Sequence, residues 1–433
     1  MRINKSATAI GGAGESKKER LPTNTLSHQH RVQRWANFIA GYSVEFVEQC
    51  LLGRDKNEDV VIDPFLGCGT TLVTAKNMGF RGIGFDRHQV FFNLAKAKLG
   101  NYSINDLDQI RNNLNDSKYR VEWSEHASIF LRKMFEQNEL DAINLASGAA
   151  SQMEERLKPL AIAFFLKACE ASCGGQTDGI YKAPTSIKKS IPFKRAMNVA
   201  YELFKEDIET EWYSNHWVDQ PEPICINKSS TNIDEIDSGT VGICITSPPY
   251  LNNFDYAEMT RMHLYLLGWV GSWGEISTSV RNDLITNTTT ALKGKKTEGY
   301  QLSSRSELPK TLLVELDAIV IELQCERKVR AGKKEYDYLI YPYYAEITRV
   351  LAGLYRVIKP GGVVHWVVAD AALYGIHLKT HVHTSEIMKD LGFINVTIEF
   401  IRRRGHRWIL DKRDGAKEGL GEYHLTAHKG MEH

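Results

Sequence analysis

The sequence predicts an α/β protein with a mostly parallel sheet and helices on both of its faces. Two observations carry this prediction. Continuous apolar runs at 60–62 and 241–245 are typical of strands buried on both faces, and helical patterns follow such runs. The chain has 433 residues, of which 42% are hydrophobic and 25% charged, enough for a full core, so a chain disordered throughout is excluded.

The first half of the predicted domain begins with a helical pattern at residue 30, where apolar side chains recur on one face: Trp35, Phe38, Ile39 and Tyr42. A strand follows at 60–62, then a helix that ends at Gly79. The segments FRGIGFD and HQVFFNLAKAKLG continue the alternation as a strand and a helix. This order is the start of a parallel sheet.

The alternation stops at residue 101 and resumes at Pro223. We expect strands in ICIN and VGICITS, and then one amphipathic helix over 256–269. Residues 270–335 are polar and lack a clear period. A helix over 343–362, the strand VVHWVVAD, a helix over 380–393 and the strand INVTIEFIRR complete the prediction.

These elements indicate one split domain at 30–100, 221–269 and 340–410. A mostly helical insertion occupies 101–220, and a second insertion occupies 270–339. Residues 1–29 and 411–433 are expected to be a flexible N-terminal tail and a C-terminal tail.

Charge and cysteine usage bound the class of protein. The formal net charge is +1, so only local basic clusters could support a nucleic-acid partner, as at 293–296, 326–334 and 402–408. The sequence has no apolar run of membrane-spanning length and no apolar signal segment at its start, so we expect no membrane partner. Its seven cysteines include no C-x-x-C pair, which predicts no metal site and a cytoplasmic protein.

The segment DPFLGCGTT, residues 63–71, lies between a predicted strand and a predicted helix. Gly67 and Gly69 allow a tight turn and a close approach of the backbone to a ligand. Asp86 ends the next strand, where an acidic residue in nucleotide-binding units accepts hydrogen bonds from ribose hydroxyls. A ligand that contains a ribose is therefore favoured.

The turn does not fit a dinucleotide, because the third glycine of G-x-G-x-x-G is replaced by Leu72. A phosphate-binding G-x-x-x-x-G-K-[ST] is also absent from the sequence. Asp63 would repel a pyrophosphate but would attract a cation, such as the ammonium or sulfonium of S-adenosylmethionine (AdoMet).

A second signal follows the strand at 241–246, where Ser247, Pro248, Pro249 and Tyr250 leave the carboxyl end of the strand. Ligands bind at that edge of an open parallel sheet. The two prolines stiffen the loop and leave carbonyl acceptors. Such a loop can hold an exocyclic amine while an aromatic ring stacks on its base.

Together, D-P-F-x-G-x-G-T and S-P-P-Y resemble the motifs of the amino-group DNA methyltransferases. These enzymes use AdoMet and share the Rossmann-like class I methyltransferase fold, which the resemblance implies here. It also implies that Asp86 holds the ribose of AdoMet. The residues implied to line the methionine part are Asp63, Pro64, Phe65, Gly67, Gly69 and Thr70. The helix at 35–47 would complete the pocket, and Asn227 would take the position that contacts the adenine.

The resemblance further implies a catalytic loop formed by Ser247, Pro248, Pro249 and Tyr250. Ser in the first position is usual for cytosine-N4 enzymes, so we expect methylation of the N4 amine of a flipped cytosine in double-stranded DNA. We also expect a restriction–modification role, a cognate restriction endonuclease as a partner, and association with the nucleoid through DNA. The insertion at 270–339 is the candidate target-recognition region, and 101–220 is the alternative. Exchange of 270–335 should change the methylated sequence and leave AdoMet binding intact.

Three alternatives stay open. The protein could methylate adenine N6 in DNA or guanine N2 in RNA. From another class, it could be a catalytically silent module that binds AdoMet or DNA, although the intact Ser247–Tyr250 motif favours an enzyme.

Overall fold

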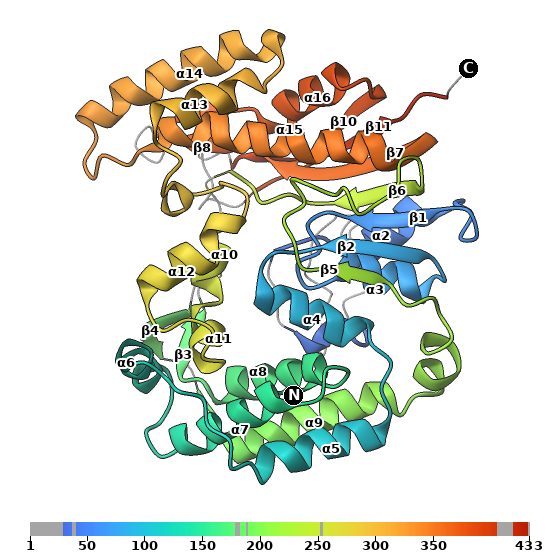
Figure 1. Ribbon diagram of the computed structural model, residues 1–433, viewed down its shortest axis with the longest axis vertical. Helices are drawn as coiled ribbons and strands as arrows, with labels where there is room; N and C mark the ends of the chain where they lie inside the picture. The colour runs from blue at the N-terminus through green and yellow to red at the C-terminus, as the bar shows by residue number, and fades with distance from the viewer. Residues whose placement is uncertain are drawn as a thin grey trace, which may run out of the picture.

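The computed structural model describes residues 29–36, 40–177, 182–187, 189–251, 254–404 and 419–431. Its centre is a seven-stranded sheet in the order β10-β11-β7-β6-β1-β2-β5 (Figure 1). The strands are β1 (Val60–Asp63), β2 (Arg81–Phe85), β5 (Ile224–Ile226), β6 (Val241–Thr246), β7 (Ile358–Ala369), β10 (Ile394–Arg403) and β11 (Gly421–His428).

The sheet is mostly parallel, as the sequence predicts. Strands β7, β6, β1, β2 and β5 pair in parallel, whereas β11 runs antiparallel to both of its neighbours, β7 and β10. Strand β6 is buried along its whole length, as expected for the middle of a sheet covered on both faces. The predicted α/β fold class is confirmed.

Strand β11 corrects the assignment of 411–433 to a C-terminal tail. Residues 421–428 form this strand, which lies inside the sheet between β7 and β10. Its sequence, GEYHLTAH, has few apolar residues, and only Leu425 and Ala427 among them are fully buried. The strand is held by main-chain pairing on both sides, which a hydrophobic pattern does not reveal.

Helices cover both faces of the sheet (Figure 1). One face packs against α2 (Val44–Leu51), α3 (Thr70–Asn77) and α4 (Gln89–Leu99). The other packs against α14 (Lys310–Val329), α15 (Ile340–Val357) and α16 (Thr380–Asp390). A small hairpin of β8 (Ala371–Leu373) and β9 (Ile376–Leu378) follows β7.

The segment from 101 to 220 forms a helical layer that packs on α4 through α8 (Figure 1). Its elements are α5 (Ile104–Asn115), α6 (Glu125–Met134), α7 (Leu140–Gln152), α8 (Lys158–Ser172), α9 (Phe193–Ile208), a short helix at Tyr213–Trp217, and the hairpin β3 (Gly175–Thr177) and β4 (Lys182–Ile187). This layer extends the core of the central sheet, because its apolar residues belong to the same hydrophobic cluster as those of α4.

The first predicted helix starts later than expected. A short 3-10 turn occupies Gln33–Trp35, and α2 begins only at Val44, with the Ser43 hydroxyl accepting from the Phe46 amide at 3.2 Å. Gly41 has a φ of +125°, which a helix cannot accommodate. Phe38 and Ile39 lie outside the described residues.

The insertion at 270–339 is more regular than its composition indicates. It contains α12 (Trp273–Ser279), α13 (Glu298–Ser306) and the long α14. Helix α14 buries Leu312, Leu316, Ile319 and Leu323 at helical spacing. The pattern was missed because Val314 and Ile321 are apolar and exposed on the opposite side, which hides the period.

The single helix expected over 256–269 is divided into α10 (Tyr256–Met259) and α11 (Arg261–Leu266).

None of the helices in the described part of the chain is both long and apolar enough to span a membrane.

Candidate active site

A pocket lies at the carboxyl edge of the sheet, where β1, β2 and β6 end. Its walls come from the turn after β1, the end of β2, the loop after β5 and the loop after β6. Eight of the predicted site residues line it: Asp63, Pro64, Phe65, Gly67, Thr70, Asp86, Ser247 and Pro249. The structure therefore brings the two sequence motifs to one cavity.

Asp63 is buried at the end of β1 and organises the turn that follows. Its carboxylate accepts hydrogen bonds from the hydroxyls of Thr71 and Thr246, both at 2.7 Å, and from the Phe65 amide at 3.0 Å. The Tyr42 hydroxyl approaches it at 3.5 Å. Burial raises the pKa of Asp63, and these hydrogen bonds oppose the rise. Because its oxygens are occupied, Asp63 can act on a ligand through its charge.

Gly67 and Gly69 both need a left-handed backbone, with φ of +50° and +86°. Gly69 does not line the pocket. It precedes the first residue of α3, and a Cβ there would lie 3.2 Å from the Cβ of Ala95 on α4. Gly69 therefore shapes the turn and the packing of α3 on α4, whereas Gly67 adjoins the cavity.

Leu72 of α3 occupies the position of the third glycine in a dinucleotide site. Here glycines on the strand, and not on the helix, allow α3 and β2 to approach closely. A Cβ on Gly82 or Gly84 of β2 would lie 2.8 Å from Leu72 side-chain atoms. The glycines of β2 thus make room for the large side chain on α3.

Asp86 follows β2 and fastens two backbone segments. Its carboxylate accepts from the amides of Gly67 at 2.8 Å and His88 at 2.7 Å. Burial, together with the charge of Asp63, raises the pKa of Asp86 to about 7 despite these two hydrogen bonds. A carboxylate with this placement can accept hydrogen bonds from ligand hydroxyls.

His88 also lines the pocket and was not predicted. Its Nε2 lies 2.9 Å from the Thr260 hydroxyl, whereas its buried Nδ1 has no hydrogen-bond partner among the described residues. Burial lowers the pKa of His88 to about 3, so the ring is neutral. A buried polar atom without a partner beside a cavity is what a ligand can satisfy.

The loop after β6 is tied to the C-terminal strand. Ser247 Oγ donates to the Tyr250 hydroxyl at 3.2 Å, and that hydroxyl donates to Glu422 Oε1 on β11 at 3.1 Å. The other oxygen of Glu422 accepts from Arg402 Nε at 2.6 Å. Tyr250 is only 9% exposed, and neither it nor Pro248 lines the pocket.

This chain of hydrogen bonds fixes the direction of the Ser247 proton. A carboxylate only accepts, so the single proton of Tyr250 points to Glu422, and the tyrosine oxygen must accept from Ser247. The lone pairs of Ser247 Oγ are then available at the pocket wall. The arrangement presents a hydrogen-bond acceptor beside the Asp63–Asp86 cavity.

Comparisons with known proteins agree with this geometry. The family model described as DNA methylase, of the N6/N4 type, matches residues 7–97. The Type II methyltransferase M.BsoBI of Geobacillus stearothermophilus is 24% identical over 99% of this chain and 90% of its own length. The Type II methyltransferase M.AvaI of a Nostoc species is 22% identical over 83% of this chain and 78% of its own.

The match of residues 7–97 and the similarity to these Type II enzymes support an amino-methyltransferase family for this chain. Among solved structures, a SAM-dependent methyltransferase from Methanosarcina mazei is 9% identical and covers 87% of this chain and 94% of its own, with a TM-score of 0.29.

Part of the pocket comes from a segment that the sequence motifs do not mark. Four residues at 283–287 line the cavity: Asp283, Leu284, Ile285 and Asn287. Asp283 pairs with Arg87 at 2.6 Å, and Thr286 is held by the buried Glu346 of α15, whose carboxylate accepts from its amide at 2.6 Å. The insertion at 270–339 thus contributes to the cavity, so exchanging all of it should not leave cofactor binding intact.

Two further contributions were predicted only in part. The pocket is completed by the loop Ala40–Tyr42 that precedes α2, and not by a helix over 35–47. Asn227 does not line the pocket; its amide donates to the Asp86 carbonyl at 2.7 Å, and the next residues, 228–230, line the cavity instead. A single sequence gives no signal for these loops, because no motif marks them.

Several basic side chains predicted to contact phosphate are paired within the protein. Lys295 binds the buried Glu346 at 2.8 Å, and Lys296 pairs with Glu335. Arg402 is engaged by Glu422. Residues 405–408 lie outside the described part of the chain. The side chains of Lys295 and Arg402 therefore stabilise the fold through these ion pairs.

Proposed function

We propose that this protein is an AdoMet-dependent DNA methyltransferase that methylates the exocyclic N4 amine of cytosine. The orientation of Ser247 is the observation that carries the proposal. Glu422 and Tyr250 hold its hydroxyl as an acceptor, which is what an amine with two N–H donors needs.

The residues around the cavity fit AdoMet as the methyl donor. Asp86 offers carboxylate oxygens for ribose hydroxyls, and Nδ1 of His88, which has no partner among the described residues, offers a further acceptor or donor. The charge of Asp63 favours a cationic ligand over a phosphate. AdoMet, when bound, supplies a methyl group on a positively charged sulfur.

The chain's own residues then position the base. A base within a duplex cannot reach the cavity, so it must be flipped out at a cost of a few kcal/mol. Ser247 Oγ and the Pro248 carbonyl would accept from the amine and aim its nitrogen into the pocket. Positioning of this kind lowers the barrier without a covalent bond to the protein.

Tyr250 acts in this proposal mainly through its hydroxyl. Its ring was expected to stack on the flipped base, but the side chain is 9% exposed, and the guanidinium of Arg404 lies 5.6 Å from the ring centre. A base can stack on this ring only after neighbouring side chains move. Orientation of Ser247 requires no such movement.

The choice of cytosine rests on Ser247, since an uncharged first residue resembles the cytosine-N4 members of the family. Methylation of adenine N6 is the alternative, and the same pair of acceptors could hold its amine. As the Type II relatives suggest, we propose double-stranded DNA as the partner and a restriction–modification role alongside a cognate endonuclease.

The experiment is to incubate DNA with the protein and labelled AdoMet, digest the DNA, and identify the methylated nucleoside. We expect N4-methylcytosine, and none with Ser247→Ala protein that still binds AdoMet. N6-methyladenine would overturn the choice of base. Label found only in RNA would overturn the assignment as a DNA methyltransferase. So would the absence of methyl transfer by protein that binds AdoMet.

A further inference from the structure

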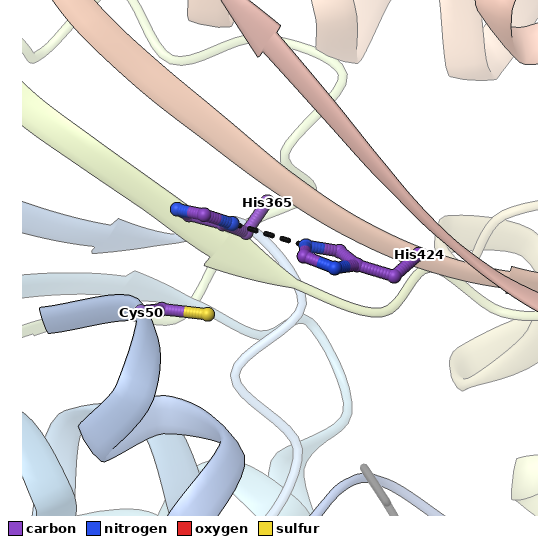
Figure 2. Close-up of side chains that lie close together, drawn as sticks. All are labelled: Cys50, His365 and His424. Carbon is purple, nitrogen blue, oxygen red and sulfur yellow. Dashed lines mark hydrogen bonds between the residues drawn. The ribbon is translucent and has the colours of Figure 1, made fainter. Parts of the chain in front are cut away.

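Three side chains with metal-binding atoms meet on the face of the sheet beneath α2, away from the residues that line the pocket (Figure 2). They are Cys50 in the last turn of α2, His365 on β7 and His424 on β11. One ligand atom from each lies within 4.8 Å of the others, and all three side chains are partly buried.

The strand pairing brings the two histidines together. His424 lies opposite Val367 and His365 lies opposite Thr426, so the histidines are diagonal neighbours on one face of the sheet. Their rings stack with centroids 5.2 Å apart, and His365 Nδ1 lies 3.0 Å from His424 Nε2. Figure 2 shows Cys50 reaching toward this pair from the helix.

We propose that Cys50, His365 and His424 bind one zinc ion. A thiolate with two imidazole nitrogens is a ligand set that Zn²⁺ favours. Zinc lies about 2.0–2.1 Å from nitrogen and about 2.3 Å from sulfur, which puts tetrahedral ligand atoms about 3.3–3.6 Å apart. The two histidine nitrogens are 3.0 Å apart and all three atoms lie within 4.8 Å of one another, so side-chain rotations would complete the site.

Binding of zinc requires one proton to leave and another to move. The Cys50 thiol loses its proton to solvent when sulfur binds the metal. The proton between His365 Nδ1 and His424 Nε2 moves to the other nitrogen of its own ring, because both facing nitrogens become ligands. Two neutral imidazoles and one thiolate then surround the ion, and a water can take the fourth position.

A carboxylate lies beside the outer nitrogen of one of the two histidines. Glu399 Oε2 on β10 is 3.7 Å from His424 Nδ1, the nitrogen that faces away from His365. Metal-bound histidines usually donate their outer N–H to a carboxylate or carbonyl, which fixes the ring. Arg54 adds opposing charge near His365, but it is itself paired with Asp59 at 2.9 Å.

The ion would join parts of the chain that flank the active site. Helix α2 follows the Ala40–Tyr42 loop of the pocket, and β11 carries Glu422 two residues before His424. Zinc would therefore be a structural clamp between the start and the end of the described fold. This inference does not depend on the proposed methylation of DNA.

The sequence predicted no metal site because the ligands come from three distant segments and form no short motif. The test is the zinc content of the full-length, untagged protein measured by mass spectrometry after dialysis. We expect about one zinc per chain in the wild type and loss of it in Cys50→Ser and His424→Asn. Cys225→Ser is the matched control, because Cys225 is also a half-buried free thiol, and it should keep the metal.

A second measurement covers variants that fold poorly. Cobalt added to chelator-treated wild-type protein should give a thiolate-to-cobalt charge-transfer band, which zinc then removes. The band should persist in Cys225→Ser. Absence of both zinc and the cobalt band in folded wild-type protein would overturn the proposal. So would equal zinc in wild type and folded Cys50→Ser, since that result means an adventitious ion only.

Discussion

The two sides of the active site are held in place differently. On the cofactor side, Asp86 fastens the glycine turn through the amides of Gly67 and His88, all within one stretch of the chain. On the base side, Ser247 and Tyr250 depend on Glu422 of β11, which comes from the C-terminal end of the described fold. A motif can therefore reveal the glycine turn of the cofactor side, whereas on the base side it reveals Ser247 and Tyr250 but not the Glu422 that orients them.

The largest effect is expected where the local contacts are strongest. Asp86→Asn should weaken AdoMet binding by about 10- to 100-fold, because charge-assisted hydrogen bonds are worth about 1.5–3 kcal/mol. Titration calorimetry would measure it, with Asp237→Asn as an exposed control away from the pocket. Wild-type affinity in Asp86→Asn would contradict the ribose assignment.

The pH dependence of binding sharpens this test. Burial raises the pKa of Asp86 to about 7, and ribose hydroxyls bind the ionised form, so AdoMet affinity should rise as pH increases through 7. The dissociation constant of AdoMet should be about tenfold larger at pH 6 than at pH 8. Asp63 and the Tyr256 hydroxyl are the acidic groups that interact electrostatically with Asp86. The basic Arg87 is the next residue in the sequence. The profile should flatten in Asp86→Asn.

A smaller effect is expected from the remote contact on the base side. Glu422→Gln should slow methyl transfer by about tenfold, or about 1.4 kcal/mol, because a neutral amide no longer fixes the Tyr250 and Ser247 protons. Single-turnover rates would show this, while AdoMet affinity stays at the wild-type value. Glu386→Gln, a change in a surface ion pair with Lys389, is the control.

Two outcomes would contradict the role of Glu422. An unchanged rate would mean that Ser247 is oriented without it. An equal loss of AdoMet affinity would indicate a general structural defect, and Glu422 would then not be a positioning residue for the base.

The sequence predicted the elements whose apolar residues lie in continuous runs, such as β1, β6 and β7. It also predicted the residues that form D-P-F-x-G-x-G-T and S-P-P-Y. It missed β11, because the polar Glu422 and His424 hide a strand that main-chain pairing stabilises. It missed 283–287 and His88 because their place at the pocket is set by tertiary contacts, such as that of Glu346 with Thr286.

The smallest expected effect tests whether the 270–339 insertion belongs to the cofactor side. Asp283 pairs with Arg87 at 2.6 Å, with both side chains more than a third exposed, and such pairs contribute about 0–1 kcal/mol. Asp283→Asn should therefore weaken AdoMet binding by at most about fivefold, more at low than at high salt. The exposed Asp234→Asn, which pairs with Arg356 only at 3.9 Å, is the control. Wild-type affinity of Asp283→Asn at low salt would contradict a role of this ion pair in the pocket, and the insertion would then contribute only its apolar and backbone groups.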